Sequence, residues 1–94
     1  MRVNRDEAIL AEKQLLWKLY KYGAWGTKHL CESNLQKGFP PHLRGKTILE
    51  IAEGLRKRGF LGKHATHHEP QWYLNWGKKA EIEEILKDFL QMRF

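Results

Sequence analysis

The chain lacks the features that define several large classes of protein. It has one cysteine, Cys31, so it cannot form an internal disulfide, and we expect a reducing compartment. It has no uninterrupted apolar run of the roughly 18–20 residues that a transmembrane helix needs, so we expect no membrane contact. Residues 1–7 also lack the apolar stretch of a secretory signal. These absences predict a soluble, cytoplasmic protein.

The chain also lacks the motifs of the common active sites. It has no Gly-rich phosphate loop, no nucleophile elbow and no helical His-Glu-x-x-His. His29 and Cys31 are two residues apart, a spacing that does not place both side chains on one helix face. Because Leu30 and Leu35 lie close by, we interpret Cys31 as a small core residue. We therefore expect no enzyme activity and no cofactor.

Positive charge is plentiful but unevenly distributed. The 94 residues, enough for a single domain over 1–94, carry 17 Lys and Arg against 11 Asp and Glu, a net charge of +6. Residues 42–64 hold six basic and two acidic residues, a net charge of +4, whereas residues 65–94 hold four basic and five acidic residues. A basic middle is typical of a surface that faces a polyanion such as nucleic acid. An ordinary solvated surface is the alternative.

Hydrophobic spacing predicts two helices in the first part of the chain. The first begins near residue 5, where Asn4 can cap it, and ends at Gly23. Its apolar positions at helical spacing are Ile9, Leu15, Leu16, Leu19 and Tyr20. Residues 24–26 form a break with room for one short strand, and Thr27 can cap a second helix that runs to about Lys37. Two adjacent prolines, Pro40 and Pro41, forbid helix across them.

The second part of the chain predicts a helix, a hairpin and another helix. Thr47 and Glu50 form a capping box, and the helix ends at Gly59; an earlier start at Pro41 is the alternative. An apolar stripe runs along it through Ile48, Ile51, Ala52 and Leu55. Two short strands with a polar loop between them follow over about residues 60–75. A last helix, about 78–91, has Ile82, Ile85, Leu86 and Phe89 facing inward.

This order of elements resembles the winged helix-turn-helix family of transcriptional regulators. The resemblance is sharpest at the end of the third helix, where apolar residues, a glycine and two further apolar residues stand in the family's register: Ile48, Ala52, Leu55, Gly59, Phe60 and Leu61. It implies an α+β, mainly helical fold with a three-helix core, a β-hairpin wing at about 60–75 and a C-terminal helix at about 78–91. The connection over residues 38–46 is longer than the family's usual tight turn.

The resemblance also implies a function and a set of contacts. A recognition helix at about 46–58 would enter the major groove of double-stranded DNA, as expected of a small, nucleoid-associated transcriptional regulator. Base edges would meet its N-terminal half, namely Arg44, Lys46, Thr47 and Glu50. Phosphates would meet Arg56, Lys57 and Arg58, and the wing residues Lys63 and His64.

Two glutamates in the middle of the proposed DNA face support other interpretations. Glu50 would cap the helix, and Glu53 would pair with Lys57 one turn later. In that case the basic residues contact phosphates without reading sequence. A winged-helix module for protein–protein or RNA contacts in a larger assembly is the alternative function.

Two further segments each have two interpretations. The wing histidines, His64, His67 and His68, have no standard zinc spacing, so we expect no metal, and we interpret Trp72 as a core ring. The C-terminal segment has more apolar residues than one stripe needs, including Leu90, Met92 and Phe94. This surplus predicts a homodimer through the C-terminal helix, unless the first helix covers all of it.

Overall fold

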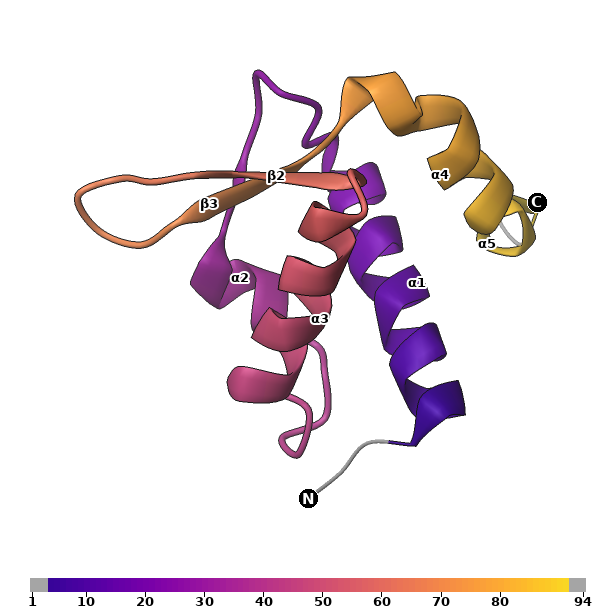
Figure 1. The fold of residues 1–94 in the computed structure, drawn as a ribbon, viewed down its shortest axis with the longest axis horizontal. Helices are drawn as coiled ribbons and strands as arrows, with labels where there is room; N and C mark the ends of the chain where they lie inside the picture. Colours follow the sequence, from indigo (N-terminus) through magenta and orange to yellow (C-terminus); the bar gives the residue numbers. More distant parts are fainter. Residues whose placement is uncertain (1–3, 92–94) are drawn as a thin grey trace.

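The structure, a computed structural model, describes residues 4–91 and is an α+β fold, mainly helical, with one small antiparallel sheet (Figure 1). Its elements in chain order are α1 (Arg5–Tyr22), β1 (Leu30–Cys31), α2 (Glu32–Gln36), α3 (Lys46–Lys57), β2 (Leu61–His64), β3 (Gln71–Leu74), the 3-10 turn η1 (Trp76–Lys78), α4 (Lys79–Ile85) and α5 (Lys87–Gln91). Among residues 4–91, no helix combines the length and apolar character that a membrane crossing requires.

The sheet has the strand order β1-β3-β2, with both neighbouring pairs antiparallel. In the β2–β3 hairpin, Leu61 pairs with Leu74 at the base and His64 pairs with Gln71 near the loop. The hairpin loop projects away from the helices, while its base adjoins the C-terminal end of α3 (Figure 1). The predicted hairpin is therefore present, with its ladder limited to residues 61–64 and 71–74.

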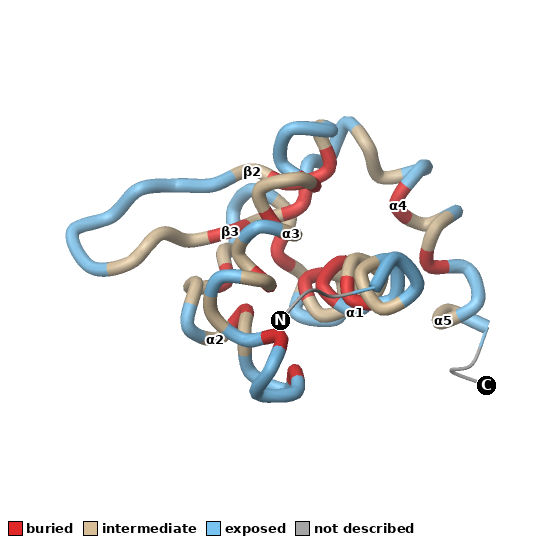
Figure 2. The backbone as a smooth tube through the Cα atoms, turned by 60° about the horizontal axis from the view of Figure 1, so that its bottom comes forward, coloured by how far each residue is buried: buried red, intermediate tan, exposed pale blue. Residues whose placement is uncertain are grey.

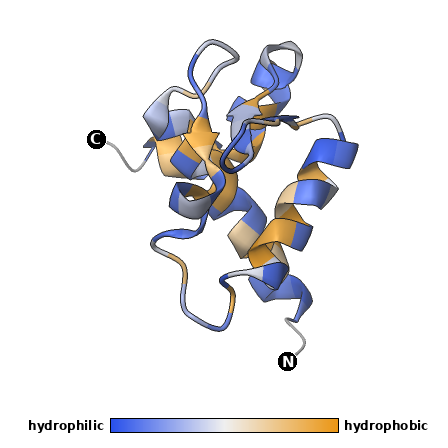
Figure 3. Cartoon of the chain, turned by 90° about the vertical axis from the view of Figure 1, so that its left-hand side faces the viewer, coloured by the Kyte–Doolittle hydropathy of each residue, from blue (hydrophilic) through white to orange (hydrophobic). Residues whose placement is uncertain are grey.

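The core lies where α1, α3 and the sheet meet, with α4 covering one end. Figure 2 shows the buried segments collected on the inner sides of these elements, and Figure 3 shows hydrophobic residues at the same junction. Trp72 is fully buried, which confirms its interpretation as a core ring, and its indole Nε1 donates to Glu32 Oε1 over 3.1 Å. The largest fully buried side chains are Trp72, Leu15, Leu16, Leu19, Leu35, Ile48, Leu55, Leu74, Ile82 and Leu86.

The limits predicted for the first helix are confirmed. Asn4 Oδ1 accepts from the backbone N–H of Glu7 over 2.8 Å, and Gly23 ends the helix with a φ of 77°, which favours glycine. The predicted apolar face is wrong at Ile9, which is 47% exposed. Ala11, one turn before Leu15, is the first buried residue of α1, so the buried face of the helix begins at Ala11 rather than at Ile9.

The second helix and first strand differ from the prediction. Thr27 does not cap a helix, because Leu30 and Cys31 pair with Trp72 and Gln71 of β3 and are held extended. The helix is therefore restricted to α2, and the short strand is β1 rather than residues 24–26. Cys31 is half-buried at the sheet edge rather than a core residue.

The capping box predicted for the third helix is also wrong. Gly45, with a φ of 76°, takes the N-cap position, so Lys46 is the first helical residue and Thr47 lies too far along to cap. The N–H of Gly45 donates to Gln36 Oε1 over 2.6 Å, which joins the start of α3 to the end of α2. The apolar stripe is confirmed, with Ile48 buried beside Ala52 and Leu55.

The last helix is divided into η1, α4 and α5 rather than continuous. Leu86 lies between α4 and α5, and it is fully buried with Ile82. Ile85, Phe89 and Leu90 are partly buried against the same core, and Phe89 makes an edge contact with Trp17 at 5.8 Å. Helix α1 therefore covers much of the apolar surplus, while Met92 and Phe94 fall outside the described residues.

Candidate nucleic-acid interface

The exposed side of α3 brings together the face predicted from helical spacing. Lys46, Glu50, Glu53 and Lys57 lie along one shallow depression. The uncharged residues Gly45, Leu49 and Gly54 complete its lining. The depression is therefore lined by two cations, two carboxylates and three uncharged residues, and its charges follow one another along the helix axis.

Glu53 is the most strongly held carboxylate of this face. Its Oε2 lies 2.8 Å from Arg56 Nη2 on the next turn of α3, and its Oε1 lies 3.0 Å from Lys63 Nζ on β2. The hydrogen bond from Arg56 and, to a smaller extent, the one from Lys63 lower the pKa of Glu53 to about 2. The predicted pair with Lys57 is wrong, because the hairpin brings Lys63 within reach of the same carboxylate.

The two ends of the face are held more loosely. Lys46 Nζ lies 3.8 Å from Glu50 Oε1, and both side chains are mostly exposed. An exposed pair of this kind contributes about 0.5 kcal/mol, so Lys46 can turn to another anion. The prediction that Glu50 caps the helix is wrong, because the start of α3 has no side-chain capping hydrogen bond. Lys57 is exposed, and its side chain has neither an ion pair nor a hydrogen bond within residues 4–91. Thr47 is half-buried beside this end of the helix.

The two remaining arginines brace the fold. Arg58 Nη1 donates to both carboxylate oxygens of Glu12 on α1, each over 3.1 Å, and its guanidinium lies 5.2 Å from the ring centre of Phe60. Arg44 Nε donates to the carbonyl of Phe39 over 2.7 Å, within the connection between α2 and α3. The orientation of both guanidinium groups is therefore held by contacts inside the protein.

The hairpin residues predicted to contact DNA pack over the sheet. The ring of His64 stacks on His29 at 5.6 Å between centroids and 16° between planes, and His29 lies against Tyr73 at 5.2 Å. Lys63 Nζ lies 5.2 Å from the ring centre of Trp72. Lys63 and His64 are both exposed, and both lie on β2, the strand next to α3.

The far end of the hairpin is tied to α2. Glu69 accepts from the backbone N–H of Ser33 over 2.5 Å and from its hydroxyl over 3.1 Å, and these bonds lower the pKa of Glu69. Thr66 Oγ1 donates to the carbonyl of Glu69 over 2.6 Å. His67 and His68 lie exposed in this loop. Within residues 4–91, no three His, Cys, Asp or Glu side chains are grouped so that they could hold a metal ion.

Several of these contacts had no signal in the sequence. Glu12 lies 46 residues from Arg58, and Ser33 lies 36 residues from Glu69. Glu12 and Ser33 are ordinary polar residues on helices, and no spacing rule connects either of them with a partner so distant along the chain. One further basic group did have a signal: Lys18 and Lys21 are three residues apart, which places both on one face of α1.

The geometry therefore places basic side chains of α3 and β2 on adjoining surfaces, interrupted by two carboxylates. Comparisons of the chain with protein-family models, with curated proteins and with solved structures found no match.

Proposed function

We propose that this chain is a winged-helix domain that binds double-stranded DNA, as a small transcriptional regulator of the cytoplasm. The fold supports this proposal through the order of its elements and through the sheet order β1-β3-β2, in which the hairpin adjoins the end of α3. In this assignment α3 is the recognition helix and the β2–β3 hairpin is the wing.

The observation that carries the proposal is the cationic edge shared by α3 and the hairpin. Lys57 is exposed and free of partners within the described residues, and Arg56 and Lys63 lie on either side of one carboxylate. Because Glu53 joins the helix to the strand, both elements would meet a duplex as one rigid surface. Phosphate oxygens would then replace or extend the contacts that the cations make with Glu53.

The same geometry favours contact with the DNA backbone over reading of bases. Glu53 is committed to two cations, so it is not available to accept from a cytosine amino group. Arg44 and Arg58 are oriented by contacts inside the protein. Lys46 and Thr47 remain available to contact base edges. The other predicted contact residues would position the protein on the DNA without reading its sequence.

The test compares two lysine variants of equal charge change. Lys57→Gln should weaken binding to a labelled duplex several-fold and lower the slope of log affinity against log salt by about 0.9, the value for one phosphate contact. Lys87→Gln is the matched control, since Lys87 is an exposed lysine of α5, paired with Glu84 and far from α3 along the chain. Fluorescence anisotropy between about 50 and 200 mM salt gives both quantities. Equal effects of the two variants would show only a general charge effect and would refute the proposal.

A protein or RNA partner is the second candidate, and the mixed lining of the α3 depression favours it. The uncharged Leu49 and Gly54 line the same depression as the acidic and basic side chains, a combination that also fits a peptide segment of mixed charge. Electrophoretic shifts with duplex, single-stranded DNA and RNA of equal length separate these cases. Preference for RNA, or binding to none of the three, favours the second candidate.

Homodimer formation through the C-terminal helix stays a proposal. Since Phe89 packs against Trp17 of α1 and Leu90 packs against the core, the remaining apolar surface of α5 is smaller than the sequence implied. Sedimentation at micromolar concentration distinguishes a dimer from the 11.2 kDa monomer.

A further inference from the structure

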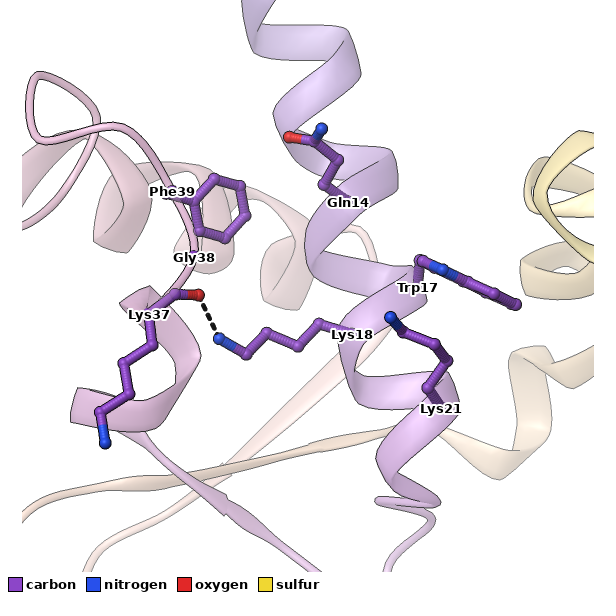
Figure 4. A pocket seen from close by; sticks show the side chains of 7 residues that line it. All are labelled: Gln14, Trp17, Lys18, Lys21, Lys37, Gly38 and Phe39. Atoms are coloured by element: carbon purple, nitrogen blue, oxygen red, sulfur yellow. Dashed lines mark hydrogen bonds between the residues drawn. The ribbon is translucent and has the colours of Figure 1, made fainter.

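A second basic site lies between α1 and the connection that follows α2 (Figure 4). It is an open cavity of about 330 Å³. Its lining comprises Gln14, Trp17, Lys18, Lys21, Lys37, Gly38 and Phe39. None of these seven residues belongs to the α3 depression. The cavity is therefore separate from the surface assigned to DNA.

Three lysines supply the charge of this cavity, and its lining has no carboxylate. Figure 4 shows Lys18 reaching from α1 to the carbonyl oxygen of Lys37, to which its Nζ donates, with Lys21 one turn further along α1. Burial lowers the pKa of Lys18, and the charges of Lys37 and Lys21 lower it further. The charges of Lys37 and Lys21 therefore each oppose the charge of Lys18, and a bound anion would offset this effect.

The lysines here differ from most of the other clustered cations. Lys13, Lys63 and Lys79, for example, each lie within 3.6 Å of a carboxylate oxygen. By contrast, the side chain of Lys37 has no ion pair or hydrogen bond in the part of the chain that the structure describes. Contacts within the fold account for Lys18, which satisfies a carbonyl at the end of α2, and for Lys21, whose ammonium lies 5.5 Å from the ring centre of Trp17. They do not account for Lys37, whose side chain extends from the edge of the cavity away from the other two lysines (Figure 4).

The walls of the cavity suit a compact ligand. Phe39 is buried and forms one wall, whereas the ring of Trp17 turns away toward the C-terminal helices, where it contacts Phe89 (Figure 4). Gln14 also lines the cavity and offers a side-chain amide. A neighbouring depression shares Lys37 and Gly38 and adds Arg44, so positive charge continues beyond the cavity. The cavity therefore has room for linked phosphoryl groups, and its lining lacks an exposed aromatic face for a base.

We propose that this cavity binds a small polyphosphate anion, with Lys18, Lys21 and Lys37 as its cationic donors. Ammonium groups donating to phosphate oxygens make strong, charge-assisted hydrogen bonds. The site does not rest on DNA binding by α3, and the two ligands could be bound together because their residues do not overlap.

The test is calorimetric titration of the whole chain with inorganic pyrophosphate at constant ionic strength. Lys37→Gln is the main variant, because its side chain makes no bond that folding needs. It should weaken pyrophosphate binding roughly fivefold to tenfold, as the loss of one charge-assisted contact predicts. Lys87→Gln, with the same charge change on α5, should stay within about twofold of the wild type. No binding by the wild type, or equal weakening by both variants, overturns the proposal.

A second set of measurements separates a small anion from nucleic-acid phosphate. Duplex affinity is measured for the same variants and for Lys57→Gln. The proposal expects Lys37→Gln to leave duplex affinity within about twofold of the wild type while it weakens pyrophosphate binding. If Lys37→Gln weakens duplex binding at least as much, the cavity is a backbone contact and the small-anion proposal fails. If instead Lys57→Gln has no effect on the duplex but pyrophosphate still binds, only the function proposed for α3 fails.

Discussion

Glu53 of α3 and Lys63 of β2 are joined by a 3.0 Å ion pair across ten residues of sequence. The same carboxylate holds Arg56 at 2.8 Å, so one acidic group fixes two cations and links the helix to the hairpin. An acidic residue on a basic face would ordinarily oppose a polyanion. Here it also bridges the two elements that carry the face, and the two effects can be separated by substitution.

Glu53→Gln should raise affinity for duplex DNA while lowering stability. The substitution removes one negative charge and releases Arg56 and Lys63 toward phosphates, so we expect several-fold tighter binding and a salt slope steeper by about one to two contacts. Anisotropy titrations over a salt series measure both. Glu81→Gln is the control, because Glu81 pairs with Lys78 near the other end of the fold. Weaker duplex binding by Glu53→Gln would show that Glu53 itself contacts the nucleic acid or that its tether is indispensable.

The stabilising effect of Glu53 should disappear in acid. Its pKa in the folded chain is about 2, below the usual 4.5, and a carboxylate with a lowered pKa stabilises the fold above its unfolded pKa. That contribution is complete above about pH 4.5 and is lost as the pH falls toward 2. Since about a third of the side chain is exposed, solvent screening limits the effect to about 1 kcal/mol. Urea unfolding of the wild type and Glu53→Gln should differ by this amount at pH 6 and converge on acidification; a difference independent of pH would contradict the assignment.

Two glycines should respond oppositely to alanine. A Cβ on Gly62 of β2 would lie 2.2 Å from Cζ of Tyr73, its cross-strand partner, so the ring must swing away and lose its contact with His29. We expect Gly62→Ala to cost about 1–2 kcal/mol, in the range of overpacked sites. At Gly54 in α3 a Cβ meets nothing within 4 Å, so Gly54→Ala should stabilise the fold by about 0.5–1 kcal/mol. Denaturant midpoints of the two variants test this, and a shift in the same direction for both would be inconsistent with the Tyr73 contact.

Asn75 should matter more than its exposure suggests. Its Nδ2 donates to the carbonyl of Gly59 over 2.7 Å, and its Oδ1 accepts from the N–H of Gly77 over 3.0 Å. These bonds join the end of α3 to the start of η1, so Asn75→Ala should cost about 1–2 kcal/mol. Asn34→Ala is the control, because the side chain of Asn34 has no hydrogen bond among the described residues. Thermal unfolding of both variants distinguishes the clamp from a general effect of replacing asparagine.

The sequence by itself determined the elements that depend on local physics. Asn4 and Gly23 bound α1 because a cap and a left-handed residue need only their own neighbours along the chain. The stripe Ile48, Ala52 and Leu55 is buried because helical spacing alone puts these side chains on one face. The β2–β3 hairpin follows from two short apolar runs separated by a polar loop.

The tertiary structure decided everything that depends on partners far along the chain. Residues 30–31 are a strand because β3 supplies hydrogen bonds that local helix propensity cannot match. Glu53 pairs with Lys63 rather than Lys57 because the hairpin folds back beside α3. Lys18 and Lys21 were adjacent on one helix from the start, but only packing of the connection after α2 brought Lys37 to them and formed a cavity. Spacing along a helix fixes faces, whereas long-range packing decides which faces meet, and in this protein the candidate sites lie where they meet.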